Sequence, residues 1–356
     1  MKAFIKFSLT MVLTLILSLT CLILASKIFT PKWVNHDMNM MTFIVKGFYK
    51  EPKNSLDIVF LGNSDTYRGV DPLVMYHEYG FTSYNFVSAG QRMWTGYAMF
   101  EEALRTQNPK IIMFNADGLF STNQSSSGNY SKVYDNMPFS LSKIKYIFDS
   151  NYKKKRKIER LTHLLPIFSY HDRYNELSND DFKYAFYDYH YALKGMDLVA
   201  YRVPYNGDKN YMKDTGKREE LPDINTFYLD KMISKCKERN IEFVLFHTPS
   251  SDSANYSRYL AVKNYADKNS ITFLELNLYN KEIGMNWKED TSDGGDHLNM
   301  FGAEKVGLYL GKWLIQNYDL PDHRNDKKYA KWNEDYETYL VVRNKEIEDA
   351  KELGRF

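Results

Sequence analysis

The sequence is short of cysteine and of net charge, and both shortages exclude classes of protein. Only two cysteines occur among 356 residues. Cys21 lies in an apolar segment and Cys236 in a stretch patterned like a surface helix, so we expect no disulfide between them and no metal site built from cysteine. The formal net charge is +2, and Lys2 and Lys6 account for it, which leaves 45 basic residues against 45 acidic ones. This balance argues against a nucleic-acid-binding protein.

The remaining composition is that of an ordered globular protein. Hydrophobic residues make up 44% of the chain and charged residues 26%, so neither disorder nor a repeat array is indicated. The length is sufficient for one large domain or two small ones. We expect one domain with a large insertion.

An apolar segment lies near the N-terminus. Residues 7–25 carry no charge and approach the roughly 20 residues that a helix needs to cross a bilayer. Lys2 and Lys6 precede this segment, so the positive-inside rule keeps the N-terminus in the cytoplasm and exports the chain after Lys27. We therefore predict an uncleaved, single-pass anchor in the cell membrane over residues 1–26, with the rest of the chain extracytoplasmic.

Two other readings of this segment are less favoured. A cleaved signal peptide usually has an apolar core of about 7 to 15 residues, and Ile23-Leu24-Ala25 is a poor small-x-small cleavage site. Lipid attachment at Cys21 is disfavoured because Thr20 precedes it and apolar residues follow.

Beyond an expected juxtamembrane linker at 27–55, strands and helices alternate. Helical patterns occur at about 94–106, 229–239 and 256–268. Short apolar runs predict five buried strands, at 57–61, 83–87, 110–115, 241–246 and 271–276. This alternation of strands and helices predicts an α/β fold in which helices cover both faces of a parallel sheet.

The third and fourth predicted strands are separated by too many residues for a simple crossover. We expect an insertion at 118–224, within a main domain that spans 56–318 and precedes a helical tail at 319–356. The insertion contains a basic run at 153–157, which is typical of a solvated helix face. The same run in an exported domain could instead meet an anionic glycopolymer or a lipid surface.

A serine follows the first predicted strand. Gly62-Asn63-Ser64 places Ser64 just past the carboxyl end of that strand, where open parallel sheets carry their reactive groups. Gly62 permits a tight turn, and the next residues can present backbone N–H groups to an oxyanion. A plain helix cap is the alternative.

A histidine and two carboxylates occur together near the other end of the chain. Asp293-Gly294-Gly295-Asp296-His297 precedes a helix that we expect to begin near Phe301. A serine hydroxyl needs a neighbouring base to become nucleophilic, and the base needs a carboxylate to hold its tautomer and stabilise its cation. We therefore predict Ser64 as the nucleophile and His297 as its base, with a structural role for His297 as the alternative.

These residues resemble the SGNH/GDSL hydrolase superfamily over residues 57 to about 318, apart from the insertion. The resemblance implies a flavodoxin-like sheet and an Asp–His element near the end of the domain. Gly62-Asn63-Ser64 matches the first block of the superfamily, with Asn63 where aspartate is usual. Gly90 matches the second block, whose glycine N–H serves the oxyanion hole. Neither this family nor the residues imply a cofactor or a metal.

Two blocks depart from the superfamily pattern. Asn115-Ala116-Asp117 follows the third strand where Gly-x-Asn is usual, so Asp117 takes the place of the oxyanion-hole asparagine. An ionised carboxylate repels an oxyanion, and Asp117 therefore binds a substrate hydroxyl or stays protonated, while Asn115 points elsewhere. The second departure is Asp293, four residues before His297 instead of three. We choose Asp293 as the partner of His297 and keep Asp296 as the second choice.

The anchor and the insertion resemble membrane-tethered proteins that modify surface polymers, namely alginate-type O-acetyl transfer proteins and the D-alanyl transfer proteins of teichoic acid. The His-Leu-Asn-x-x-Gly-Ala run after Asp296 adds to this closer resemblance. It implies an envelope polysaccharide or teichoic-acid-like substrate and a membrane partner that exports acyl groups. His171 and Arg173 either line the site or form a structural salt bridge. His247, at the end of the fourth strand, either contacts substrate or belongs to the edge of the core.

We therefore predict serine-dependent acyl transfer or ester hydrolysis on a cell-envelope polymer. The alternative is a catalytically degenerate module of the same fold that binds or scaffolds such a polymer, which Asp117 and the shifted Asp293 would explain. A secreted lipase is disfavoured by the anchor.

Overall fold

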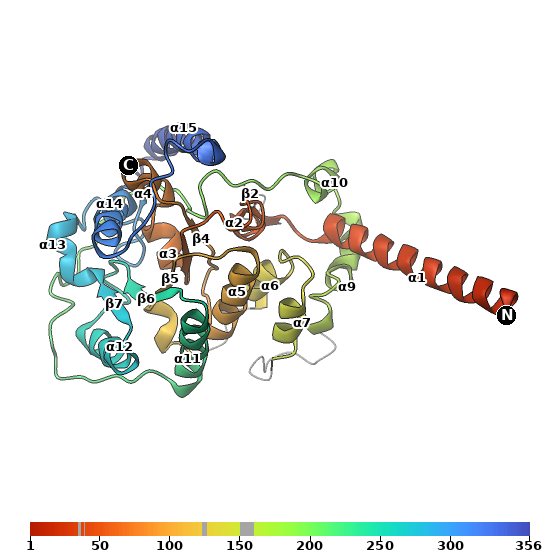
Figure 1. The fold of residues 1–356 in the computed structure, drawn as a ribbon. Helices are drawn as coiled ribbons and strands as arrows, with labels where there is room; N and C mark the ends of the chain where they lie inside the picture. The colour runs from red at the N-terminus through yellow and green to blue at the C-terminus, as the bar shows by residue number, and fades with distance from the viewer. Residues whose placement is uncertain (35–36, 39, 123–126, 150–159) are drawn as a thin grey trace. The chain divides into compact units, whose positions relative to one another are not determined.

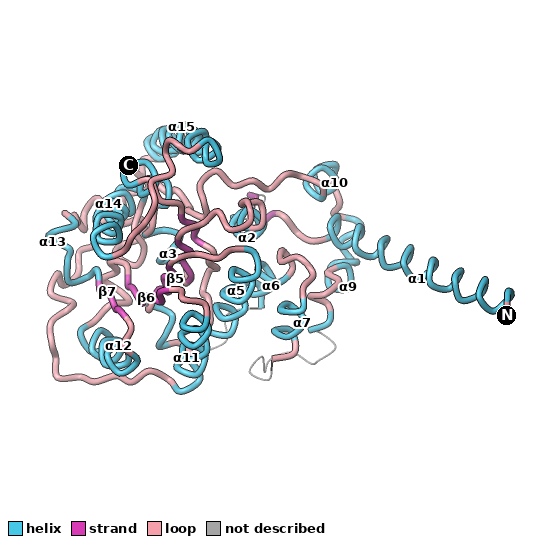
Figure 2. The backbone as a smooth tube through the Cα atoms, viewed as in Figure 1, coloured by secondary structure: helices cyan, strands magenta, loops and turns pink. Residues whose placement is uncertain are grey.

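The computed structural model describes residues 1–34, 37–38, 40–122, 127–149 and 160–356. The basic run at 153–157 lies outside these residues. The chain divides into two compact units, one formed by Met1–Thr42 with Ser131–Tyr189 and the other by Phe43–Tyr130 with His190–Phe356. Their elements are shown in Figures 1 and 2.

The larger unit contains a five-stranded parallel sheet. In spatial order its strands are β4 (Ser83–Asn85), β3 (Ile58–Leu61), β5 (Ile111–Asn115), β6 (Glu242–His247) and β7 (Thr272–Glu275). Each neighbouring pair is parallel, and the order is that of flavodoxin-like sheets. The predicted fold class is therefore confirmed, and each strand lies within two residues of its predicted bounds.

Both faces of the sheet are buried, which is why the strands are continuous apolar runs without polar alternation. Phe60, Met113 and Phe246 point into a cluster that also contains Val306 and Leu310 of α14 (Met300–Asn317). α4 (Pro72–Tyr79) packs on the same side. Side chains alternate along a strand, so the intervening residues face the other way.

The opposite face is covered by α5 (Met93–Thr106) and α11 (Asp223–Glu238). Phe114 of β5 stacks against Phe243 of β6 there, and a Cβ on Gly96 of α5 would lie 3.2 Å from the Phe114 ring. α12 (Tyr256–Asn269) packs against β7. With helices on both faces, the carboxyl ends of the strands form an open edge for a site.

The last long helix, α15 (Ala330–Glu352), packs on α4. The Trp332 ring lies 5.0 Å from that of Tyr76, and the Tyr76 hydroxyl donates to Asn333 Oδ1 over 3.1 Å. The buried Lys194 ammonium also pairs with Asp335 of α15 and with Glu51, each at 2.7 Å. These buried pairs fix α15 to the domain.

The smaller unit has helices around the N-terminal helix α1 (Lys2–Phe29) and a short antiparallel pair, β1 (Trp33–Val34) with β2 (Asp37–Met38). α9 (Ile167–Tyr170), the 3-10 helix η2 (His171–Asn175) and α10 (Asn179–Ala185) pack against α1. α1 is long and apolar enough to cross a membrane, a property that a signal sequence shares.

Gly62 joins β3 to the turn that carries Ser64 and has a φ of +147°. A Cβ at this position would lie 2.7 Å from the Cβ of Asn115 and 2.5 Å from Thr66 Oγ1. Only glycine therefore allows the turn to approach β5 so closely.

We predict that Gly62→Ala lowers the free energy of unfolding by about 2–4 kcal/mol, because it adds a backbone strain and a steric clash. Urea denaturation of the detergent-solubilised protein measures this loss. Gly284→Ala is the matched control, since Gly284 also has a positive φ, of +75°, but its Cβ would meet no atom within 4 Å. Equal losses for the two variants would contradict the steric explanation.

Candidate active site

Ser64 is the first residue of α3 (Ser64–Gly69), directly after the β3 turn. Asn63 caps this helix, and its side-chain oxygen accepts from the backbone N–H of Asp65 over 3.3 Å. A neighbouring turn is tied to the same place, because Ser88 N–H donates to the carbonyl of Gly62 over 3.2 Å. The sheet thus holds Ser64 at its carboxyl edge.

His297 lies on the loop before α14, and this loop is anchored on both sides. Thr291 and Leu298 form an antiparallel bridge, and Asn299 caps α14 by accepting from the N–H groups of Phe301 and Gly302. The side-chain amide of Asn299 also donates to the carbonyls of three residues: Tyr201, Glu289 and Thr291. The position of His297 is therefore fixed by the ends of its loop.

The structure brings Ser64 and His297 together. His297 Nε2 lies 2.8 Å from Ser64 Oγ, and His297 Nδ1 lies 2.5 Å from Asp293 Oδ2. The other oxygen of Asp293 accepts from the backbone N–H of His297 over 2.8 Å, so both oxygens hold the same residue. Asp296 Oδ2 is also near, at 3.3 Å from Nδ1. Serine, imidazole and carboxylate form the chain that nucleophilic catalysis requires.

These carboxylates set the protonation of the imidazole. Burial alone would lower the pKa of His297, but the hydrogen bond to Asp293 and the charges of Asp296 and Asp293 raise it above the usual value. Burial likewise opposes ionisation of Asp293, yet its hydrogen bonds with His297 hold its pKa below the usual range. The cation that forms when His297 accepts a proton is therefore stabilised.

A second polar chain crosses the same edge of the sheet. The Asn63 side chain donates to Asp117 Oδ2, and Asp117 Oδ1 lies 3.9 Å from His247 Nε2. His247 Nδ1 lies 3.1 Å from Glu275 Oε2. Asp65 connects this chain to the first, since its Oδ1 is 4.0 Å from His297 Nε2. Four of the five strands supply a member, at or just beyond their carboxyl ends.

Asp65 and Asp117 are neighbouring carboxyl groups whose pKa values are shifted in opposite directions. Burial and the neighbouring charge of Asp117 raise the pKa of Asp65 well above its usual value. Burial also disfavours the Asp117 carboxylate, but the charge of His247 and a hydrogen bond with Asp65 lower its pKa. Burial opposes the charged form of His247, and Glu275 more than offsets this effect and raises the His247 pKa. These opposite pKa shifts favour the proton of the pair on Asp65 and the charge on Asp117.

Gly90, expected to serve the oxyanion, and Asn115, expected to point elsewhere, occupy different places. Gly90 lies in the turn after β4 with a φ of +54°. Among the described residues, no acceptor bonds to the N–H of Gly90 or to that of Ser64. Asn115 is buried instead, where its amide donates to Thr248 Oγ1 over 3.3 Å and its oxygen accepts from the N–H of Asp117 over 3.0 Å.

His171 and Arg173 belong to the smaller unit. His171 is exposed on η2. The Arg173 guanidinium donates to the carbonyl of Phe29 over 2.5 Å and lies 3.3 Å from Glu176 and 3.6 Å from Asp181. The guanidinium therefore has structural partners within its own unit.

Sequence reasoning missed Asp65 and Glu275. Asp65 follows the serine directly, and Glu275 is the last residue of β7, so both carried the positional signal of the carboxyl edge. It also missed Arg68, which pairs with Asp197 at 2.6 Å and whose charge lowers the pKa of Asp293.

Asp65, Asp296 and His297 place ligand atoms within 4.8 Å of one another, as a metal site would. Both ring nitrogens of His297, however, lie within hydrogen-bond distance of Ser64 and Asp293. The geometry therefore fits proton transfer to and from the serine better than metal binding.

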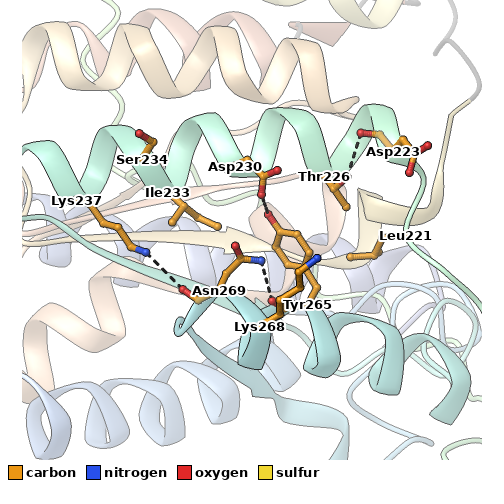
Figure 3. A pocket seen from close by; sticks show the side chains of 10 residues that line it. All are labelled: Leu221, Asp223, Thr226, Asp230, Ile233, Ser234, Lys237, Tyr265, Lys268 and Asn269. Atoms are coloured by element: carbon orange, nitrogen blue, oxygen red, sulfur yellow. Dashed lines mark hydrogen bonds between the residues drawn. The ribbon is translucent and has the colours of Figure 1, made fainter.

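A groove of about 610 Å³ lies between α11 and α12 (Figure 3). Its polar side chains bond to neighbours: the Tyr265 hydroxyl donates to Asp230 over 2.6 Å, and the Asn269 amide donates to the carbonyl of Tyr265 over 3.0 Å. None of the lining residues belongs to the Ser64 site; they are Leu221, Asp223, Thr226, Asp230, Ile233, Ser234, Lys237, Tyr265, Lys268 and Asn269.

We predict opposite effects on stability for substitutions of Asp65 and Asp117. Because the native protein holds a proton on Asp65 that the unfolded chain releases, this residue lowers stability as pH rises above the usual aspartate pKa of about 3.9. Asp65→Asn should remove that loss, since a neutral amide can still donate to Asp117. Urea denaturation at several pH values measures the slope for each protein.

Asp117→Asn removes the anion that faces His247 and accepts from Asn63, so it should cost about 1–3 kcal/mol at neutral pH. If Asp65→Asn kept the wild-type pH slope, or cost as much as Asp117→Asn, the assignment of the proton to Asp65 would be wrong.

No family model matches this sequence, and no curated protein matches it. Seven chains among the solved structures match, and two of them illustrate the likeness in fold. One is a Bacteroides fragilis protein named as an acylhydrolase, with 12% identity, coverage of 77% of this chain and 94% of that one, and a TM-score of 0.36. The other is a GDSL-like lipase from Bacteroides thetaiotaomicron, with 10% identity, coverage of 79% and 100%, and a TM-score of 0.37. At TM-scores below 0.5, neither likeness bears on what this chain does.

Proposed function

We propose that the protein is a serine-dependent enzyme of acyl transfer or ester hydrolysis, in the SGNH/GDSL manner. One observation carries the proposal: the Ser64 hydroxyl and the His297 imidazole are in hydrogen-bond contact, and Asp293 holds the other nitrogen of the same ring. This arrangement is the one that converts a weak nucleophile into a reactive one.

In the proposed reaction, Ser64 Oγ attacks the acyl carbonyl while His297 Nε2 takes the hydroxyl proton. The ester bond of the donor then breaks, and the alcohol leaves with the proton that His297 returns. Water or an acceptor hydroxyl attacks the acyl-serine next, giving its proton to His297, which passes it back to Ser64 Oγ as the serine is released. Asp293 stabilises the imidazolium formed in each half of the reaction.

The N–H groups of Ser64 and Gly90 are the proposed donors to the oxyanion. Asp117 stands where the superfamily has a third donor, and removal of one such donor costs roughly 100- to 1,000-fold in rate in other enzymes. Its charge is partly balanced by Asn63 and His247. The ionised Asp117 therefore suits an acceptor hydroxyl, which can donate to it, better than an oxyanion.

The proposed substrate is an envelope polysaccharide or a teichoic-acid-like polymer carrying O-acetyl or D-alanyl groups. This part rests on the likeness of the motifs to membrane-tethered transfer proteins and on α1, in which Lys2 and Lys6 precede the uncharged run at 7–25. We propose that α1 anchors the chain in the cell membrane with the N-terminus cytoplasmic and the site outside. A membrane protein that exports acyl groups is the proposed partner.

Asp117 favours a second candidate function. A carboxylate in the oxyanion position is what a polymer-binding module that has lost catalysis would tolerate. Such a module would retain polysaccharide without turning over acetyl or alanyl esters, and these two measurements separate the candidates.

We predict that a fluorophosphonate probe labels the protein at Ser64. Ser64→Ala should abolish both labelling and the hydrolysis of acetyl esters, because the nucleophile is lost, whereas Ser234→Ala, at an exposed serine of α11, should change neither. Mass spectrometry of the labelled protein identifies the site. Labelling that persists in Ser64→Ala would exclude this serine as the nucleophile.

The rate of labelling should depend on the neutral form of His297. Since the pKa of His297 lies above the usual value of about 6.5, the rate falls as pH decreases through this raised pKa. Asp293→Asn should move the inflection to lower pH and slow labelling by about 100- to 10,000-fold, because it removes the hydrogen bond that stabilises the cation.

Asp296→Asn is the matched control, since Asp296 contributes charge at 3.3 Å while Asp293 makes the 2.5 Å contact. It should shift the inflection less and leave the rate within about tenfold of wild type. If the two variants exchanged these effects, Asp296 would be the orienting carboxylate.

A further inference from the structure

Three short elements within the expected insertion, α9, η2 and α10, are bonded to the C-terminal end of α1. The backbone N–H of Ile167, the first residue of α9, donates to Ser26 Oγ over 3.2 Å. The Arg173 guanidinium on η2 donates to the carbonyl of Phe29, the last residue of α1. These contacts set α9 and η2 beside the end of α1, and α9 can be followed there in Figure 1.

α10 is held to the same end by buried charges. The Lys32 ammonium lies 3.6 Å from Asp181 Oδ1, and both side chains are buried. Arg173 reaches the same oxygen at 3.6 Å, while the Lys32 ammonium also donates to the carbonyls of Ile28 and Thr30. α9, η2 and α10, with Phe186 directly after α10, therefore form one structure around the end of α1, which we call the collar (residues 167–186).

The depth of the collar along α1 follows from these bonds. The uncharged run at 7–25 is about 28 Å long as a helix and matches the hydrocarbon core of a bilayer. Ser26, to which α9 is bonded, is the next residue. The Lys27 ammonium, one residue further, lies 5.9 Å from the centre of the Phe186 ring, just after α10. If α1 spans a membrane, these elements stand where hydrocarbon gives way to headgroups.

Large aromatic side chains are exposed at this depth. Phe168 on α9 is 55% exposed, Phe182 on α10 is 51% and Phe186 is 64% exposed. Phe182 and Phe186 are one helical turn apart, whereas Asp181 and Ala185 are the buried side of the same turn. Exposed rings of this size next to Lys27 and Lys183 have the composition of an interfacial anchor, in which apolar rings enter the lipid boundary and long cations reach the phosphates.

We propose that the collar lies in the membrane interface, with the rings of Phe168, Phe182 and Phe186 inserted among the lipids of the leaflet at the C-terminal end of α1. The proposal rests on the anchoring role of α1 given above, but not on the chemistry of Ser64. A lipid surface is the fitting occupant because the rings share the depth at which the apolar run ends, and because cations flank them.

Spin-label measurements on the full-length protein in vesicles of phosphatidylethanolamine and phosphatidylglycerol test the proposal. Cys21→Ala removes the cysteine of the apolar run, while Cys236 is buried and burial raises its pKa to about 12, so it stays unlabelled. Single cysteines replace Phe168, Phe182 or Phe186, and each label is probed with oxygen, which concentrates in lipid, and with a nickel chelate, which stays in water. We expect labels about 5–10 Å below the level of the headgroups.

Two further positions make the outcome decisive. Asp180→Cys lies on the exposed polar side of α10 and should report water, and Leu13→Cys in α1 should report the hydrocarbon core. If the collar labels are as accessible to the nickel chelate as the label at Asp180→Cys, while the label at Leu13→Cys reports lipid, the collar proposal is overturned and the anchor proposal stands. Collar labels shielded from both reagents would mean that protein covers the rings, which also overturns the proposal.

A label at Leu13→Cys that reports water would contradict both the membrane anchor and the collar proposal. Fluorophosphonate labelling of the same samples reports separately on Ser64, so failure of the collar and failure of the proposed chemistry are distinguishable.

Discussion

The contact between Ser64 Oγ and His297 Nε2 is the interaction on which the proposed chemistry depends, and the chain must bring together residues 233 positions apart to form it. The sheet provides one half of the contact, because Gly62 lets the turn after β3 pass against β5 and fixes Ser64 at the carboxyl edge. The other half depends on α14, whose N-terminal cap also ties down the His297 loop. Both halves pack on the same apolar face of the sheet, so the geometry of the site is a property of the core.

Around this contact the protein arranges negative charge asymmetrically. Asp293 and Asp296 face the imidazole and favour its cation. For Asp65, closer to the serine side of the ring, burial and the charge of Asp117 raise the pKa and favour its neutral form, while His247 favours the charge on Asp117. A third full charge beside His297 Nε2 would hold the proton too firmly for its return to a leaving group. The second polar chain thus limits the basicity of the first.

Much of this could be predicted from the sequence. The strands were readable because a doubly covered parallel sheet needs uninterrupted apolar runs, and the proximity of Ser64 and His297 followed from the rule that such sheets gather reactive groups at one edge. The roles of Asp65, Glu275 and Arg68 could not be read, since a carboxylate or guanidinium at a strand end is common and only its neighbours in space decide its charge. Asn115 shows the same limit. Its amide donates to Thr248 Oγ1, and this contact with a residue 133 positions away holds the Asn115 side chain in the core. The contacts of Arg173 with the end of α1 were likewise outside the reach of pattern reasoning.

Because the His297 loop is anchored at both ends, the length of its middle part can change without moving its ends. Thr291 and Asn299 carry the fixed points, whereas Gly294 has a φ of +86° and open space beside it. A loop pinned in this way can gain a residue in its middle without displacing the residue near its end, provided that glycine absorbs the extra curvature. The four-residue step from Asp293 to His297 lies wholly between these fixed points, so its length is decided within the loop and not by the sheet or by α14.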